Sequence, residues 1–180
     1  MLRKLLNNIW LITSLALSLY VGFPLTTSQH FHTHDDIQIF RVNEYLSCIH
    51  DGQLPCRWSR DLGKGYGYPL FIFYPPMIYA IPSIIVLLVK IPISFALNLF
   101  AFLTFPLAAF GMYRLVYVLT KRQDLAAISS MLYTLLPYHA VNIFVRGVYA
   151  ENLAWSIAPL LFAELFLIIK HNKPIWLFST

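Results

Sequence analysis

Long apolar segments dominate this sequence and limit its fold more than any other feature. They are, approximately, residues 9–25, 71–89, 93–119, 125–141 and 153–169. Hydrophobic residues make up 58% of the chain and charged residues only 12%, whereas a soluble domain is about one quarter charged. A small soluble core cannot bury so many long segments, but a helix of roughly 20 apolar residues crosses a bilayer. The sequence therefore predicts an all-α integral membrane protein.

The N-terminus and the net charge fit the same prediction. Arg3 and Lys4 precede an apolar run that extends to about Thr27. This run is too long for the apolar core of a cleaved signal peptide, and no small-residue cleavage site follows it. Residues 1–27 are therefore predicted to form a signal-anchor helix. The net charge is +5, and Lys and Arg at segment edges orient helices in a bilayer rather than bind nucleic acid.

The basic segment edges predict the topology. Three edges are basic: Arg3 with Lys4, Lys121 with Arg122, and Lys170 with Lys173. Basic edges favour the cytoplasm, so an even number of crossings must separate each pair of them. One of the first three segments therefore does not span. Residues 71–89, which three prolines interrupt, are the weakest candidate.

Four spanning helices follow from this argument, in a single membrane domain of residues 1–180. The N-terminus is predicted to be cytoplasmic and the protein to lie in the inner (plasma) membrane. Residues 28–92 form a long outer loop with interfacial helices, and residues 93–170 supply three further spanning helices. The Lys and Arg residues of the loop would favour a cytoplasmic location, but charges in long loops have only a weak effect on how the helices are oriented.

The outer loop is predicted to contain one helix and one irregular stretch. Residues 36–50 have helical periodicity and predict an amphipathic helix on the membrane surface. Its apolar face is expected to hold Ile37, Phe40, Tyr45, Leu46 and Ile49. Glycines, prolines and tyrosines follow and indicate a structured loop. Cys48 and Cys56 lie in this region, where a disulfide and two free thiols both fit the sequence.

Two ionisable residues fall inside apolar segments. Arg114 lies seven residues before Lys121, and Glu164 lies six residues before Lys170. Both lie about 9–10 Å from the predicted cytoplasmic edge at 1.5 Å per residue. Because unpaired charges inside a membrane are costly, we predict an Arg114–Glu164 ion pair that holds the helices together. The alternative is that each side chain extends separately to the interface.

A first cluster of candidate functional residues follows the first segment. His30, His32 and His34 alternate directly before Asp35 and Asp36. Either aspartate can act as a general base for an acceptor hydroxyl, and the two can share a divalent cation. The alternative is a solvated helix start, where aspartate favours the helix dipole. The alternating histidines resemble a zinc site, and a solvated junction also explains them.

A second cluster is the Gly63–Tyr74 loop, which Arg57 and Arg60 precede. Its glycines allow a ligand to approach the backbone closely, and Tyr66 and Tyr68 offer ring faces to a sugar or lipid. An aromatic belt at the membrane interface accounts for these rings equally well. Arg57 and Arg60 are candidate phosphate ligands.

A third cluster lies between the last two segments. His139 follows Pro137, and Arg146 and Glu151 flank a glycine-containing turn. Arg146 is a candidate phosphate ligand, whereas a salt-bridged turn is the structural alternative. In the predicted topology this cluster reaches the same outer face as Asp35 and Asp36. Three polar clusters that are far apart in sequence would then converge.

The motifs of this chain resemble those of a bacterial membrane family. They include the acidic pair, Arg41, Gly52-Gln-Leu-Pro-Cys-Arg-Trp58, Gly63-Lys-Gly-Tyr-Gly-Tyr-Pro-Leu-Phe-Ile-Phe-Tyr-Pro-Pro76, Pro137-Tyr-His139 and Arg146-Gly-Val-Tyr-Ala-Glu151. Together they resemble the family named 6-pyruvoyl-tetrahydropterin synthase-related, which is similar to the N-terminal part of GT-C superfamily glycosyltransferases. The resemblance covers essentially the whole chain.

The resemblance implies a function on the outer face of the membrane. GT-C enzymes take a sugar from a polyprenyl-phosphate donor, and an aspartate in their first outer loop acts as base or metal ligand. Asp35 or Asp36 matches that aspartate by position, and residues 75–79 match the interfacial helix that follows it. Arg146 and Glu151 fall where the second outer loop carries functional residues. GT-C enzymes usually have more helices, so the chain is expected to be an N-terminal fragment, a truncated gene or an inactive scaffold.

The expected function is therefore a GT-C-like membrane glycosyltransferase or its N-terminal module. Asp35 or Asp36 would be catalytic, with Arg57, Arg60, Tyr66, Tyr68, His139, Arg146 and Glu151 as binding residues. The expected partners are membrane lipid, a polyprenyl-phosphate sugar, and a further membrane subunit or a missing C-terminal part. The alternative is a non-catalytic subunit that binds polyprenyl lipid or assists envelope assembly. The name of the family refers to soluble zinc enzymes, and the apolar helices argue against that activity.

Overall fold

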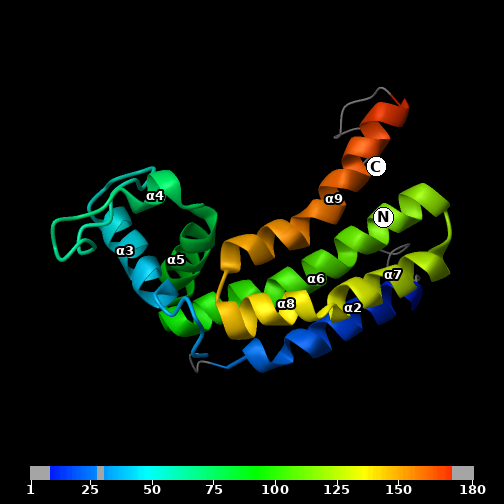
Figure 1. Ribbon diagram of the computed structural model, residues 1–180, viewed down its shortest axis with the longest axis horizontal. Helices are drawn as coiled ribbons and strands as arrows, with labels where there is room; N and C mark the ends of the chain where they lie inside the picture. Colours follow the sequence, from blue (N-terminus) through cyan, green and yellow to red (C-terminus); the bar gives the residue numbers. More distant parts are fainter. Residues whose placement is uncertain (1–8, 28–30, 172–180) are drawn as a thin grey trace. The chain divides into compact units, whose positions relative to one another are not determined.

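The computed structural model of the protein describes residues 9–27 and 31–171, and the regular elements in these ranges are helical (Figure 1). In chain order they are α2 (Ile9–Gly22), η1 (Phe23–Leu25), α3 (Gln38–His50), α4 (Leu70–Phe73), α5 (Met77–Val89), α6 (Ile93–Thr120), α7 (Gln123–Leu135), α8 (Pro137–Val141), η2 (Asn142–Arg146) and α9 (Tyr149–His171). No strand forms in these ranges, and one isolated antiparallel bridge joins Ser59 and Tyr68. The predicted all-α class is confirmed.

Three helical stretches are long and apolar enough to cross a membrane. They are Ile93–Thr120, Gln123–Arg146 and Tyr149–Lys170, and they correspond to the last three apolar segments of the sequence. The stretches Ile9–Leu25 and Met77–Val89 are shorter. A helix of 13 residues, such as α5, rises about 20 Å, which is less than the ~30 Å of a hydrocarbon core. The proline-interrupted segment is therefore too short to cross as a single helix.

Prolines end two of the helices. Tyr74 has extended backbone (φ −103°, ψ 143°) before Pro75 and separates α4 from α5. Leu136 (φ −56°, ψ 128°) ends α7 before Pro137. A residue that precedes proline is pushed out of the helical region by a clash with the proline ring. After Leu136 the chain continues as α8 and then as the π-helical turn η2.

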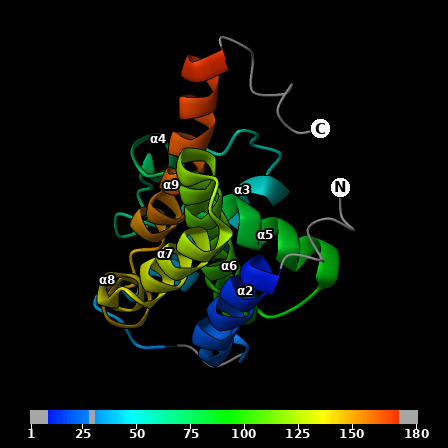
Figure 2. The same cartoon turned by 90° about the vertical axis from the view of Figure 1, so that its right-hand side faces the viewer.

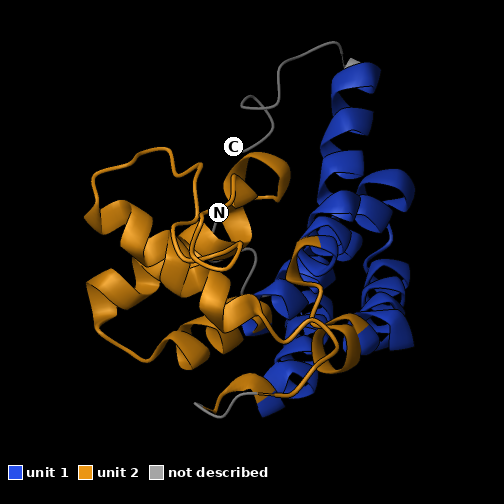
Figure 3. Ribbon diagram, turned by 60° about the vertical axis from the view of Figure 1, so that its left-hand side comes forward, with its two compact units in different colours: residues 1–24, 102–141, 151–180 blue, residues 25–101, 142–150 orange. Residues whose placement is uncertain are grey.

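The chain divides into two compact units (Figure 3). Unit 1 contains Met1–Pro24, Phe102–Val141 and Glu151–Thr180. Unit 2 contains Leu25–Ala101 and Asn142–Ala150. The outer-loop residues that the sequence singled out, together with Arg146, thus fall in unit 2, whereas His139 and Glu151 belong to unit 1.

Unit 1 is a bundle of closely packed helices. In it α2 lies along α7 (Figures 1 and 2). The buried core cluster there contains Leu11 of α2, Ala126 and Ala127 of α7, and Tyr113 of α6. A Cβ at Gly111 of α6 would lie 3.2 Å from a backbone nitrogen of α9. Small residues of this kind let membrane helices approach each other closely.

The predicted ion pair is present in unit 1. The Nε of Arg114 on α6 donates a hydrogen bond to Oε1 of Glu164 on α9. The side chains are 29% and 17% exposed, respectively. The pair joins two of the candidate spanning helices, which confirms the prediction that these charges meet. The basic edge residues Arg3, Lys4 and Lys173 lie outside the described residues.

Unit 2 is built around α3 and α5, which pack against each other. The hydroxyl of Ser83 on α5 donates to the carbonyl of Val42 on α3 at 3.3 Å. The ring of Phe71 packs edge-on against Tyr45 and Tyr79, at centroid distances of 4.9 and 5.8 Å. These contacts form an apolar core outside the candidate spans.

The predicted helix in residues 36–50 is present as α3, and its predicted apolar residues differ in burial within unit 2. Tyr45 and Leu46 are buried, but Ile37 and Phe40 are 36% and 38% exposed. The buried face instead includes the polar residues Gln38 and Glu44 together with Val42 and Cys48. A hydrophobic periodicity cannot find this face, because two of its buried residues are polar and gain hydrogen bonds within unit 2.

Candidate functional site

The acidic pair lies in an extended segment that precedes α3. The backbone N–H of His34 donates to the carbonyl of Val145 (2.9 Å), and the N–H of Asp35 donates to the carbonyl of Arg146 (3.1 Å). The first and third polar clusters of the sequence are therefore joined, as expected, through the Asp35 and Arg146 segments. Gly147 allows this close approach: its φ is +70°, and a Cβ there would lie 2.3 Å from Oγ1 of Thr33.

Four side chains form a closed ring of hydrogen bonds around Asp35. Nε2 of Gln38 donates to Asp35 Oδ2 (2.7 Å), and the Tyr79 hydroxyl donates to Gln38 Oε1 (3.2 Å). Nη1 of Arg41 donates to the Tyr79 hydroxyl (3.2 Å) and lies 3.4 Å from Asp35 Oδ2, which closes the ring. Gln38 also donates to the carbonyl of Gly147 (2.9 Å). The ring thus holds both α5 and the segment after η2 against α3.

The surroundings keep Tyr79 neutral and Arg41 charged. Burial raises the pKa of Tyr79 to about 12, against an opposite effect of Arg41, so Tyr79 is neutral and can donate a hydrogen bond to Gln38. Burial acts to lower the pKa of Arg41, but Tyr79 and Asp35 outweigh it and the net shift is upward. The guanidinium stays charged and stacks over the ring of Tyr74, 4.5 Å from the centroid.

The Asp35 carboxylate is engaged at only one of its oxygens. Both side-chain contacts, from Gln38 and Arg41, fall on Oδ2, and no described residue donates a hydrogen bond to Oδ1. The side chain is 31% exposed. Asp35 therefore has one oxygen fixed by the protein and another that can accept a proton from a bound molecule.

Asp36 has different surroundings from Asp35. Its Oδ2 lies 3.1 Å from Nδ1 of His32, and the two side chains are 43% and 89% exposed. Neither aspartate caps α3, because Ile37 holds the N-cap position and no side chain caps the helix there. The capping explanation for the acidic pair is therefore wrong.

The sequence suggested two metal sites, one at Asp35 and Asp36 and one at His30, His32 and His34. Across the residues that the structure describes, no group of three or more His, Cys, Asp or Glu is placed to hold a metal ion. His30 lies outside the described residues, so the predicted set of His30, His32 and His34 is not complete in the structure.

Arg146 lies at the end of the π-helical turn η2. Its Nη1 donates to Oδ1 of Asn142 at 2.8 Å, and the N–H of Val148 donates to the carbonyl of Asn142 at 3.0 Å. Asn142 is fully buried, so it anchors the turn. Short π-helical turns are frequent at functional sites because they re-aim side chains, and here the turn sets the position of Arg146 next to the Asp35 segment.

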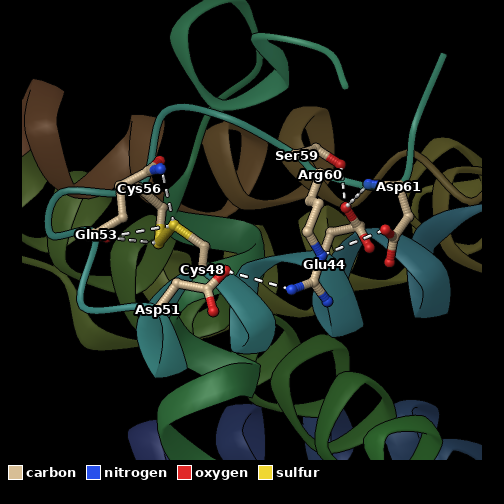
Figure 4. Close-up of polar contacts among 8 residues, drawn as sticks. All are labelled: Glu44, Cys48, Asp51, Gln53, Cys56, Ser59, Arg60 and Asp61. Carbon is tan, nitrogen blue, oxygen red and sulfur yellow. Dashed lines mark hydrogen bonds and ion pairs between the residues drawn. A yellow bond between two sulfur atoms is a disulfide. The ribbon is translucent and has the colours of Figure 1, made fainter. Parts of the chain in front are cut away.

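The loop after α3 is held by a disulfide (Figure 4). Cys48 on α3 and Cys56 in the loop are bonded, which decides between the two alternatives that the sequence left open. Oε1 of Gln53 accepts hydrogen bonds from the backbone N–H groups of Arg57 and Trp58, both at 2.9 Å. The loop is structured, as its glycines and prolines predicted.

A buried carboxylate anchors the rest of this loop (Figure 4). Glu44 is 1% exposed, and its Oε2 accepts hydrogen bonds from the Ser59 hydroxyl (2.5 Å) and the Asp61 N–H (2.9 Å). Arg60 lies between two carboxylates, 3.6 Å from Asp51 and 3.3 Å from Asp61. These carboxylates partly neutralise Arg60, which makes it a weaker phosphate ligand than the sequence suggested.

The remaining predicted binding residues of this loop are at the surface. Tyr66 is 89% exposed and Tyr68 is 47% exposed, and Arg57 is also exposed. Trp58 covers Gly67, where a Cβ would lie 2.2 Å from the indole nitrogen. The tyrosines therefore project from a rigid loop, a geometry that suits both sugar stacking and an interfacial belt.

A comparison with known protein families identifies a matching family. The family described as "6-pyruvoyl-tetrahydropterin synthase related domain; membrane protein" matches residues 71–179, which is more than half of the chain. The chain belongs to this family. Searches of curated proteins and of solved structures found no match.

Membership of the 6-pyruvoyl-tetrahydropterin synthase-related family agrees with the helices. The family is a membrane family, and its matched range contains all three candidate spans, so the protein is a membrane protein. The range also contains Tyr79 and Arg146. Asp35, Gln38 and Arg41 precede the matched range. The ring of hydrogen bonds around Asp35 therefore includes residues from inside and from outside the range that the family matches.

Sequence reasoning missed two members of the ring as site residues. Gln38 and Tyr79 were not selected, and Arg41 was noted only as part of the resemblance. A signal was present for part of the set, because Asp35, Gln38 and Arg41 recur every three residues and fall near one face of a helical stretch. Tyr79 is 41 positions from Gln38, and a pattern of neighbouring residues cannot predict a contact over that separation.

Proposed function

We propose that this chain is a GT-C-like membrane glycosyltransferase, or the N-terminal module of one, that uses a polyprenyl-phosphate sugar on the extracytoplasmic face. One observation carries the proposal: Asp35 is held at Oδ2 by Gln38 and Arg41, has a side chain that is 31% exposed, and is joined through its backbone N–H to the carbonyl of Arg146. A positioned carboxylate beside a cation is what transfer from a phosphate leaving group requires.

In this proposal Asp35 is the general base. Its Oδ1 takes the proton of an acceptor hydroxyl, and the hydroxyl oxygen forms a bond to the anomeric carbon of the sugar. The bond between that carbon and the phosphate oxygen breaks, and the electron pair leaves with the polyprenyl phosphate. Arg146 stabilises the negative charge that develops on the phosphate. Arg57 and the exposed rings of Tyr66 and Tyr68 would contact donor or acceptor.

A divalent cation has no step in this proposal. Asp35 and Asp36 supply carboxylate oxygens of the right chemistry, but Oδ2 of Asp35 is occupied by Gln38 and Arg41, and Oδ2 of Asp36 faces His32. Calcium prefers roughly six to eight oxygen ligands, and two carboxylates that each have one oxygen engaged supply fewer than that.

The location of the site is also part of the proposal. A disulfide between Cys48 and Cys56 favours an oxidising compartment for unit 2, which means the outer face of the plasma membrane. The proposed topology has four spans and a cytoplasmic N-terminus. Its first span is Ile9–Leu25, whose length is near the lower limit of roughly 17 residues for a crossing.

The test measures turnover and binding separately. Membranes that contain the protein are given a polyprenyl-phosphate sugar with a radiolabelled sugar, and its release from the lipid is followed. Native mass spectrometry of the purified protein detects the bound lipid. Asp35→Asn should abolish release and keep the lipid, because the amide oxygen can still accept from Gln38 and Arg41. Arg146→Ala should lose the lipid, and the control Asp124→Asn at the start of α7, which is paired with Arg122 and not with a candidate ligand, should change neither.

A second function is favoured by the ion pair between Arg41 and Asp35 (3.4 Å). A carboxylate with a charged partner can be purely structural, and the chain would then be a non-catalytic subunit that binds polyprenyl lipid. Lipid that is bound but never turned over by the wild type, with Asp35→Asn unchanged in binding, would select this function. If neither binding nor release occurs with the wild type, both functions are wrong.

A further inference from the structure

His139 is buried among the helices of unit 1 without a hydrogen-bond partner. No part of it is exposed, and its ring stacks on Phe105 of α6 with centroids 4.2 Å apart and planes 13° apart. Within the described ranges, neither ring nitrogen has a partner. A neutral imidazole carries one N–H donor and one acceptor, so both capacities are unmet.

Two further polar groups of the same kind lie close by. Asn152 on α9 is fully buried and donates through Nδ2 to Thr104 at 2.7 Å, while its Oδ1 lacks a partner in the described part of the chain. The Nε1 of Trp155, one helical turn further along, is likewise buried and unpartnered there. The Trp155 ring lies 5.1 Å from that of Tyr138, the neighbour of His139.

These contacts place the three groups at one level of unit 1. Thr104 and Phe105 are consecutive on α6, and they contact Asn152 and His139, respectively. Side chains at consecutive helix positions point about 100° apart, so Asn152 and His139 flank the same short stretch of α6. Asn152 and Trp155 are three residues apart and share a face of α9.

The unmet hydrogen-bonding capacity is expensive in this environment. Each buried polar group without a partner costs about 1–3 kcal/mol, and spanning helices have no surrounding water to relieve it. The groups are also complementary: an indole N–H donates, an amide oxygen accepts, and an imidazole does one of each. A water molecule donates two hydrogen bonds and accepts two, and buried water characteristically satisfies such groups.

We propose that His139, Asn152 and Trp155 line a water-binding site inside the spanning helices of unit 1. More than one water molecule is needed, because the two ring nitrogens of His139 point in different directions. Together these waters donate to Asn152 Oδ1 and to the acceptor nitrogen of His139, and they accept from the Trp155 indole and the donor nitrogen of His139. The site accounts for a histidine and an asparagine that apolar packing alone would not retain. It is independent of the glycosyltransferase proposal.

Radiolytic hydroxyl-radical labelling of the detergent-solubilised full chain tests this site. An X-ray pulse makes radicals from water, and a buried ring is labelled only where water lies next to it. Phe105, which stacks on His139, is the reporter. Phe71, 4% exposed and packed against two aromatic rings, is the control of the same residue type. Samples are also mixed with ¹⁸O water before the pulse, so that the label reports on exchangeable water.

The wild type should label Phe105 severalfold more than Phe71. His139→Phe keeps an aromatic stack but removes both ring nitrogens, and it should lower Phe105 labelling to the level of Phe71. The matched control Tyr138→Phe should leave it unchanged. If His139→Phe loses helix content by circular dichroism, Asn152→Leu replaces it with the same expectation. Equal labelling of Phe105 and Phe71 in the wild type, or no fall in the variant, would overturn the proposal.

Discussion

Gln38 and Asp35 are joined by a 2.7 Å hydrogen bond from the amide Nε2 to the carboxylate Oδ2. The same nitrogen reaches the carbonyl of Gly147 (2.9 Å), and the amide oxygen accepts from the Tyr79 hydroxyl (3.2 Å). Gln38 is 3% exposed, so water does not replace these bonds if the amide is lost. One buried amide therefore links the acidic segment, α5 and the segment after η2.

Gln38→Met should destabilise unit 2 by about 1–3 kcal/mol, because it leaves the Gly147 carbonyl and the Tyr79 hydroxyl without this partner. Methionine has a similar length and no amide. The loss is measured by thermal or chemical denaturation of the purified protein in detergent. Gln123→Met, at the exposed start of α7, is the matched control and should change stability by less than about 0.5 kcal/mol. Equal effects of the two variants would contradict a structural role for the ring.

The Cys48–Cys56 disulfide should make the loop after α3 sensitive to reductants. The sequence separation is 8 residues, and closing a loop of about this size stabilises a fold by roughly 2–3 kcal/mol in the chain-entropy treatment. After reduction, or in a Cys48→Ser/Cys56→Ser variant, proteolysis should increase between residues 51 and 69. A thiol-reactive reagent of high mass should shift the protein on a gel only after reduction. A shift without reductant would mean that the disulfide does not form in the cell.

Continuous apolar length is a local property, so the spans could be predicted from the sequence, and α6 and α9 lie close to the expected ranges. Backbone breaks at Leu136 and Tyr74 follow from the prolines after them. The face of α3 could not be predicted, because Gln38 and Glu44 are buried only where Tyr79 and Ser59 meet them. A hydrophobic pattern assigns such residues to the surface.

The candidate site was predictable only in part. Asp35 and Arg146 were selected for their chemistry, and the topology argument predicted that their segments meet. Which cysteine state forms depends on a Cα separation, 5.9 Å between Cys48 and Cys56, that no spacing in the sequence specifies. The sequence predicts His139 as a binding residue from its place in the Pro137-Tyr-His139 motif of the third cluster, but its ring is fully buried, and such burial depends on how the helices of unit 1 pack.

Reporter fusions should place the α5–α6 connection outside and the α6–α7 connection inside. Lys90 ends α5 and Lys121 follows α6, both with left-handed backbone. A reporter active only in the periplasm should be active after Lys90 and silent after Lys121, and one active only in the cytoplasm should show the opposite pattern. The physical basis is that α5 is too short to cross, while Lys121 and Arg122 favour the cytoplasm. The reverse pattern at Lys90 would rule out four spans.

Breaking the ion pair between α6 and α9 should destabilise unit 1. Glu164→Gln leaves the Arg114 guanidinium without its carboxylate inside a spanning helix. The expected cost is about 1–3 kcal/mol, less than for a fully buried pair, because the side chains are 29% and 17% exposed. Arg114→Gln should cost a similar amount.

The exchanged variant Arg114→Glu/Glu164→Arg is the control that separates pairing from charge alone. It keeps both charges and the distance between the two helices, and it should recover part of the stability lost by either single variant. Denaturation of the wild type, Glu164→Gln, Arg114→Gln and the double variant Arg114→Gln/Glu164→Gln in the same detergent forms a double-mutant cycle, whose coupling free energy isolates the pair. A coupling free energy near zero would mean that Arg114 and Glu164 each reach the membrane interface separately, as the alternative interpretation of the sequence holds.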